Sequence, residues 1–93
     1  MTAIETNELE IREMLLDIVR AMVDRPNDVE IALISSHEGF VFVVRAHQTD
    51  VGKLIGRNGQ TVRALQIIAS AAGLKPGLRF KIDVVQESDT LRS

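Results

Sequence analysis

The stretch VGKLIGRNGQTVRAL, residues 51–65, decides the fold of this chain because it joins two helix-compatible runs through a short break. Gly56 and Gly59 interrupt the apolar pattern, with Arg57 and Asn58 between them. A helix that starts directly after such a break exposes unpaired N–H groups beside its partial positive charge. Glycine permits both left-handed backbone and close approach of another molecule. The joint is therefore predicted to be an anion site.

Two helices are expected on either side of this joint. Thr49 is the predicted cap of the short first helix, with Asp50 near its positive end. The longer second helix has Gly73 as its predicted C-cap. Its expected inward stripe consists of Val62, Leu65, Ala69 and Ala72.

Another helix is predicted near the N-terminus, over residues 8–24. Asn7 and Glu10 have the spacing of an N-cap and its return partner, and Pro26 ends the helix. Apolar residues recur there with a period of 3.6, which defines a buried stripe. That stripe contains Ile11, Met14, Leu15, Ile18, Met22 and Val23.

Three β-strands complete the prediction. Residues 29–35 and 40–47 are β-rich and flank a short loop with Gly39, which is typical of an antiparallel hairpin. Residues 78–85 alternate between apolar and polar side chains, which indicates a strand with one wet face.

The resulting order is helix, strand, strand, short helix, long helix, strand. It predicts an α+β fold in which three helices pack on one face of a three-stranded sheet. At 93 residues the chain is expected to form a single domain over residues 7–86, with short flexible tails at 1–6 and 87–93.

Composition restricts the compartment. The chain has no cysteine, so neither disulfides nor thiolate metal sites are available. The longest apolar run is the five residues Phe40–Val44, against about 20 for a membrane span. The acidic N-terminus lacks the features of a signal peptide. A cytoplasmic protein without membrane contact is predicted.

Charge is divided unevenly along the chain. The net charge is −2 at pH 7, but residues 1–30 hold eight acids and three bases, a net of −5. Residues 31–86 hold three acids and seven bases, a net of +4. Because local potential steers a ligand more than the sum does, an anionic partner is compatible with this half of the chain.

Enzymatic and duplex-DNA functions are not favoured. His37 and His47 have no metal-ligand spacing or paired carboxylates, and no serine lies in a nucleophile elbow. No catalytic residue, metal, cofactor or small-molecule substrate is predicted. A helix-turn-helix DNA-binding domain also joins two helices by a glycine-containing turn. Here, however, the first helix is short and the second has a single basic residue, Arg63, on its outer face.

The residues Ile55-Gly56-Arg57-Asn58-Gly59, followed by Val62, resemble the I-G-x-x-G-x-x-h signature of KH domains. In that fold the GXXG loop clamps about four nucleotides of a single strand. The predicted order of elements is similar to the type II KH arrangement from about Glu8 to Val85. A single domain of this size resembles the small bacterial KhpA family of RNA-binding proteins.

This resemblance implies a set of RNA contacts. The set contains Lys53, Ile55, Gly56, Arg57, Asn58, Gly59, Gln60, Val62 and Arg63. Lys53, Arg57 and Arg63 would meet phosphates, which gives a salt slope of about −2 for a single strand. Val51 and Leu54 would add to an aliphatic groove for bases, and the second strand of the hairpin would form its far wall.

The resemblance also implies assembly. Ile67 lies away from the inward stripe of its helix, so it is a candidate dimer contact, with a second copy or a KhpB-like KH protein as partner. The predicted function is that of a single-stranded RNA-binding protein, an RNA chaperone or post-transcriptional regulator. The alternative is a protein-interaction or dimerisation module.

Overall fold

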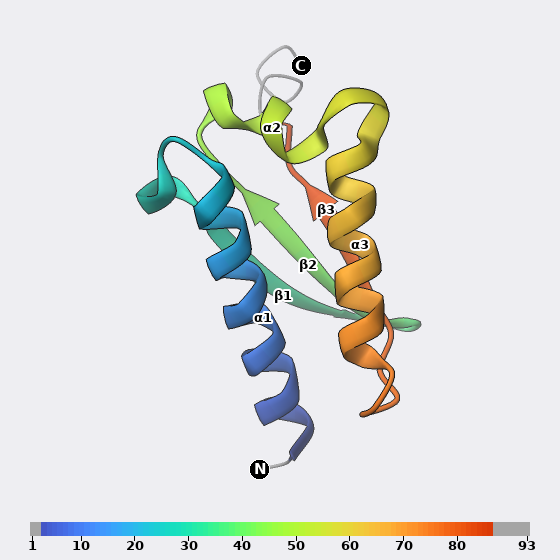
Figure 1. Cartoon of the computed structure of the whole chain (residues 1–93). Coiled ribbons are helices and arrows are strands. Elements are labelled where there is room, and N and C mark those ends of the chain that lie inside the picture. Colours follow the sequence, from blue (N-terminus) through green and yellow to red (C-terminus); the bar gives the residue numbers. More distant parts are fainter. Residues whose placement is uncertain (1–2, 87–93) are drawn as a thin grey trace.

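The helices and strands follow one another in the predicted order (Figure 1). The computed structural model describes residues 3–86. The main elements are α1 (Ala3–Met22), β1 (Glu30–Ser36), β2 (Gly39–Arg45), α2 (Val51–Ile55), α3 (Gln60–Gly73) and β3 (Phe80–Val84). Three short 3-10 helices, η1 (Pro26–Asp28), η2 (Gln48–Asp50) and η3 (Arg57–Gly59), lie in the connections.

The sheet is mixed, with β2 at its centre. β1 and β2 form the predicted antiparallel hairpin, in which Glu30 pairs with Arg45 and Ser36 with Gly39. β3 runs parallel to β2, with Phe40 opposite Phe80. A parallel neighbour requires a crossover, and α2 and α3 supply it. The predicted three-stranded α+β architecture is confirmed.

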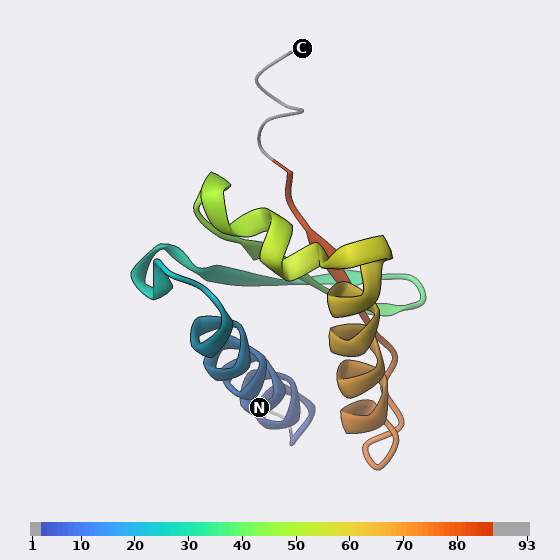
Figure 2. The ribbon, with the colours of Figure 1, turned by 45° about the horizontal axis from the view of Figure 1, so that its top comes forward.

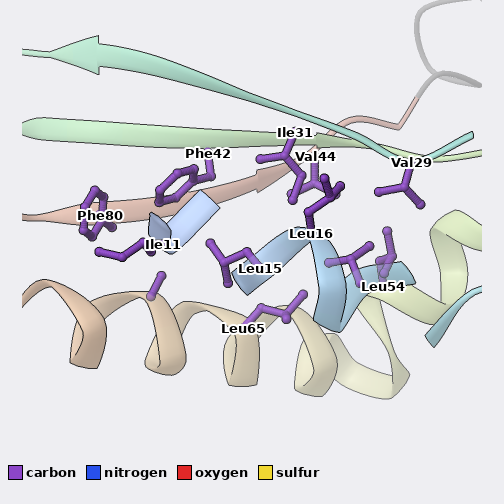
Figure 3. Packing of buried hydrophobic residues seen from close by; sticks show 12 residues of the cluster. Ile11, Leu15, Leu16, Val29, Ile31, Phe42, Val44, Leu54, Leu65 and Phe80 are labelled. Atoms are coloured by element: carbon purple, nitrogen blue, oxygen red, sulfur yellow. The ribbon is translucent and has the colours of Figure 1, made fainter. Parts of the chain in front are cut away.

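The core lies between the sheet and the helices. α1 and α3 cover one face of the sheet (Figure 2), and α2 adds Leu54 to the same core (Figure 3). The alternation of the strands explains this arrangement, because every second side chain points inward. Phe42 and Phe80 pack with ring centroids 5.0 Å apart. The other buried apolar residues are Ile11, Leu15, Leu16, Val19, Val29, Ile31, Val44, Leu65 and Ala69.

α1 differs from the prediction in its start and in its buried face. The helix begins at Ala3, so Asn7 lies inside it and is not its N-cap. Of the predicted tails, residues 3–6 are helical, and residues 87–93 lie outside the described part. Met14 is 38% exposed, whereas Leu16 and Val19 are buried. The buried face of α1 is therefore rotated from the predicted stripe, away from Met14 and towards Leu16, because α1 packs against both the sheet and α3.

The end of α3 also differs from the expectation. Gly73 is the last residue of the helix and is itself buried, rather than a left-handed cap. A Cβ at this position would lie 2.3 Å from the backbone carbonyl oxygen of Leu78 and 3.0 Å from the ring of Phe80, so glycine is required there by close packing against the segment that leads into β3. Within residues 3–86, no helix combines the length and hydropathy that crossing a bilayer requires.

Candidate nucleic-acid interface

The joint between α2 and α3 adopts a backbone that only glycine accepts readily. Gly56 has φ 77° and ψ 173°, a region that is almost exclusive to glycine, and Gly59 is left-handed with φ 73°. Asn58, at φ 57°, is the single described non-glycine residue with positive φ. The N–H of Gly59 donates to the carbonyl of Gly56 at 3.1 Å, which closes the loop. Both glycines therefore adopt the positive-φ backbone that was expected of the joint.

Polar groups at this joint face the solvent. Arg57, Asn58 and Gln60 are exposed, and no acidic residue lies in the first turn of α3. Within the part of the chain that the structure describes, no side chain caps the N-terminus of α3. The side chain of Arg63 contacts the loop, where its Nη2 donates weakly to the carbonyl of Asn58 at 3.4 Å. The loop thus combines a helix N-terminus with two arginines.

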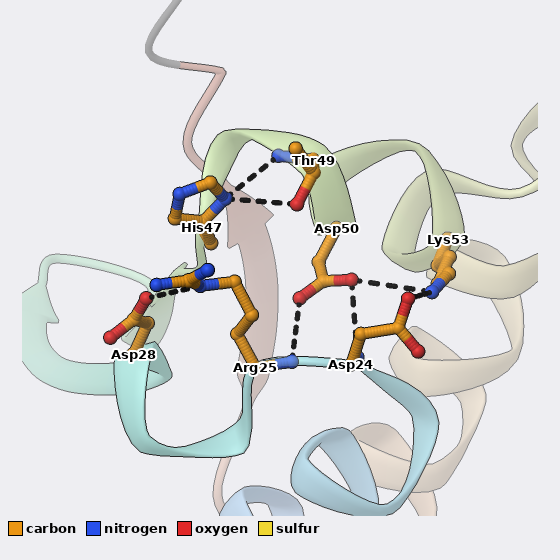
Figure 4. A network of polar contacts seen from close by, with 7 residues as sticks. All are labelled: Asp24, Arg25, Asp28, His47, Thr49, Asp50 and Lys53. Atoms are coloured by element: carbon orange, nitrogen blue, oxygen red, sulfur yellow. Dashed lines mark hydrogen bonds and ion pairs between the residues drawn. The ribbon is translucent and has the colours of Figure 1, made fainter.

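Lys53 is placed differently from the prediction. Its Nζ forms ion pairs with Asp24 at 2.5 Å and with Asp50 at 3.3 Å (Figure 4). The hydrogen bond to Asp24 is the main reason that the pKa of Lys53 is raised. Its charge is therefore already compensated, and a phosphate would have to compete with two carboxylates. Arg57 and Arg63 remain as the cations of the joint.

Asp50 fastens the end of α1 to the start of α2. Its side chain is fully buried, and its two oxygens accept the backbone N–H groups of Asp24 at 3.1 Å and Arg25 at 3.0 Å (Figure 4). Burial acts to raise the pKa of Asp50, but these bonds and Lys53 outweigh it and lower the pKa. The sequence placed Asp50 near a helix end, but it held no signal for partners 25 and 26 residues away.

The predicted cap of the short helix is wrong. The N-cap residue of α2 is Asp50, whose side chain makes no capping hydrogen bond to the helix. Thr49 lies in the preceding η2 turn, which His47 caps, because its Nδ1 accepts the N–H of Thr49 at 3.2 Å. The Oγ1 of Thr49 lies 2.9 Å from the same nitrogen. His47 is half-buried, and this contact orders the approach to α2.

The predicted aliphatic groove is only partly available. Val51, Ile55 and Val62 are half-buried at the surface around the joint. Leu54 is completely buried, so its predicted contact with a base is wrong for this structure. Helical geometry gives the reason, because Leu54 points from α2 towards the sheet, where it packs with the core (Figure 3).

The strand directly beside α3 is β3, and β2, the predicted far wall of the groove, lies behind it at the centre of the sheet (Figure 1). Gln66 of α3 bridges the seam between α3 and β3. Its Nε2 donates to the carbonyl of Phe80 and its Oε1 accepts the N–H of Ile82, both at 2.8 Å. A glutamine on a helix gives no sequence signal for such a bridge.

A row of exposed apolar residues runs along the solvent side of α3, beside the exposed polar residues Arg63 and Ser70, and ends one residue past the helix at Leu74. Ile67 is 63% exposed, as its position predicted, but it is not isolated. Ile68 and Leu74 are also exposed, and the exposed small residues Ala64 and Ala71 continue the row at helical spacing. We refer to these five residues as the α3 stripe. Sequence reasoning found one member, since the others were assigned to neither face.

A helix, a hairpin, a glycine joint between two helices and a parallel third strand together define a type II KH domain. The family model described as "KhpA/KhpB, KH domain" matches residues 12–84. The chain belongs to this family, which is a family of RNA-binding KH domains and not of enzymes.

Curated relatives agree with this assignment. The protein from Streptomyces coelicolor named RNA-binding protein KhpA is 41% identical over 75 residues, which cover 81% of this chain and 91% of the relative. The protein of the same name from Mycobacterium tuberculosis is 41% identical over 68 residues, 73% of this chain and 81% of the relative. That from Borreliella burgdorferi is 32% identical over 79 residues, 85% and 93% of the two chains. The comparison with solved structures gave no significant match.

Proposed function

We propose that this protein binds single-stranded RNA in the cytoplasm, as an RNA chaperone or post-transcriptional regulator, through the joint between α2 and α3. The observation that supports this most is the uncapped N-terminus of α3 behind Gly56 and Gly59, with Arg57 and Asn58 exposed over it. Relatives that share most of the chain are named RNA-binding proteins.

In this proposal the phosphate backbone lies against the loop. The absence of side chains at Gly56 and Gly59 lets the sugar-phosphate chain approach the main chain closely. Arg57 and Arg63 neutralise phosphates, while Asn58 and Gln60 offer amides. Val51, Ile55 and Val62 supply aliphatic surface for a base. With Lys53 held by two carboxylates, two cations give a salt slope of about −1.4 rather than −2.

The test is a titration of labelled single-stranded RNA with the wild-type protein and with the double variant Arg57→Asp, Asn58→Asp. Both side chains are exposed, so circular dichroism should show an unchanged fold. Binding should be lost, because two negative charges then face the phosphates. Unchanged affinity in the folded variant would remove the loop from RNA binding and overturn the proposal.

The second candidate function is assembly, and the α3 stripe is the observation that favours it. A short RNA contact is weak, and joining two domains raises apparent affinity through effective concentration. We propose that a second copy, or a KhpB-like KH protein, covers this stripe.

Ile67→Asp should abolish self-association in sedimentation experiments, whereas Ile34→Asp should not. Ile34 is similarly exposed, at 50%, but lies on the sheet. If Ile67→Asp left association unchanged, the stripe would not be the interface.

A further inference from the structure

Gln66 divides the seam between α3 and β3 into two parts. Both of its amide hydrogens are used, one by the carbonyl of Phe80 and one by Oγ of Ser70 at 3.0 Å, and its oxygen holds the N–H of Ile82. The glycine joint lies at one end of α3, before Gln66. At the other end, past Gln66, lie the hairpin tip and the start of β3 (Figure 1).

A pocket of about 820 Å³ occupies this second part. Half-buried Phe40 and Leu78 give it apolar surface, and Gln66 and Ser70 give it polar groups. Its volume is in the range of ligand pockets, and its mixture of apolar lining with a few polar groups suits a flat heteroaromatic ring. Phe40 also offers the kind of ring on which a base can stack.

The lining of the pocket is positively charged. Arg79 and Lys81, both exposed, outnumber the single acidic residue, Glu38. Within residues 3–86, neither cation takes part in an ion pair, in contrast to Lys53 at the other end of the groove. A ligand that joins an aromatic ring to a phosphate therefore complements both the apolar surface and the charge of this pocket.

We infer that this pocket is a second contact for the same RNA strand, and that it holds a nucleobase while Arg79 and Lys81 meet the adjoining phosphates. This inference rests on the proposed RNA-binding function. α3 rises about 1.5 Å per residue, so Ser70 lies about 15 Å along the helix from Gln60. A strand clamped at the joint reaches the pocket only if it extends well beyond the clamped nucleotides.

Oligoadenylates of two lengths test this. One has about four nucleotides, the length that a GXXG loop clamps, and one has about ten. The longer strand should bind about tenfold more tightly or better, because its second contact is intramolecular. Its salt slope should be about −2.8, from four cations, against about −1.4 for the shorter strand.

Lys81→Glu should make the salt slope for binding the longer strand shallower by about 0.7 or more. It should leave the affinity and the salt slope for the shorter strand unaffected. Arg20→Glu makes the same change in net charge on the exposed face of α1, so it is the matched control. It should leave the affinity and the salt slope unchanged for both strands. In the wild-type protein, the methyl resonances of Leu78 should shift with the longer strand only. This last measurement does not depend on any variant folding.

The outcomes separate the two proposals. If both lengths bind with the same slope and affinity, and Leu78 does not shift, the pocket is not a contact while binding at the joint stands. If neither length binds, the proposed function fails and the pocket inference fails with it. If the Leu78 resonances shift with protein concentration in the absence of RNA, the pocket faces a second copy of the chain, which also overturns the inference.

Discussion

Replacing Gly56 by alanine should destabilise the protein severely, because two independent costs act at this position. Its backbone, at φ 77° and ψ 173°, costs about 1 to 3 kcal/mol for any other residue. A Cβ would also lie 2.8 Å from both the backbone nitrogen and the Cβ of Thr61, so α3 would have to shift, at about 1 to 3 kcal/mol. We expect Gly56→Ala to lower the free energy of unfolding by about 3 kcal/mol.

Two other glycines of the same segment are matched controls. Gly59 is left-handed, but a Cβ there meets only the tip of Arg63, at 4.0 Å, so Gly59→Ala should cost about 1 kcal/mol. Gly52 is helical, exposed and has open space around it. Gly52→Ala should therefore raise stability by about 0.5 to 1 kcal/mol.

The assay is urea denaturation followed by far-ultraviolet circular dichroism, since the chain has no tryptophan or tyrosine for fluorescence. In thermal melts the same differences correspond to about 4 to 8 °C per kcal/mol for a domain of this size. From the most to the least stable, the order should be Gly52→Ala, wild type, Gly59→Ala and Gly56→Ala. Equal stability of the Gly56 and Gly59 variants would refute the reasoning, because it would mean that the contact with Thr61 does not matter.

Two further predictions concern the support of the joint. Leu54→Ala should lower the free energy of unfolding by about 2 to 5 kcal/mol because Leu54 is fully buried. Met14→Ala, at a 38% exposed site, should lower it by under about 1 kcal/mol. Similar losses for the two variants in urea denaturation would contradict the burial of Leu54. The lowered pKa of Asp50 means that its ionised form stabilises the fold at neutral pH and that this contribution is lost as the pH falls through that pKa. The stability difference between wild type and Asp50→Asn should therefore shrink between about pH 7 and pH 3, and a difference independent of pH would be inconsistent with this account.

Local patterns were sufficient to predict the order of elements. The alternation in residues 78–85 and the period of the apolar residues in α1 and α3 are set by neighbours a few positions away, and these elements formed as predicted. Helix boundaries were less accurate, because α1 begins at Ala3, whereas the capping pattern had placed its N-cap at Asn7 and its first residue at Glu8. A cap signal inside a helix is overridden when the preceding residues also favour the helix.

Tertiary partners explain what the sequence did not predict. The ion pair of Lys53 with Asp24 and the bridge from Gln66 to Phe80 join residues 29 and 14 positions apart. The burial of Leu54 likewise depends on how α2 packs into the shared core. The glycine joint could be predicted because the glycines themselves indicate its backbone conformation. The side chains packed around the joint could not be predicted, since several polar residues of the chain could equally have pointed to solvent.

The most direct test of the account is the backbone amide spectrum of the protein during titration with a short single-stranded RNA. The account predicts that the largest shifts occur at the N–H groups from Arg57 to Val62, at the uncapped start of α3. Shifts confined to the α3 stripe or to the sheet, with these amides unchanged, would contradict the claim that the joint holds the phosphate backbone.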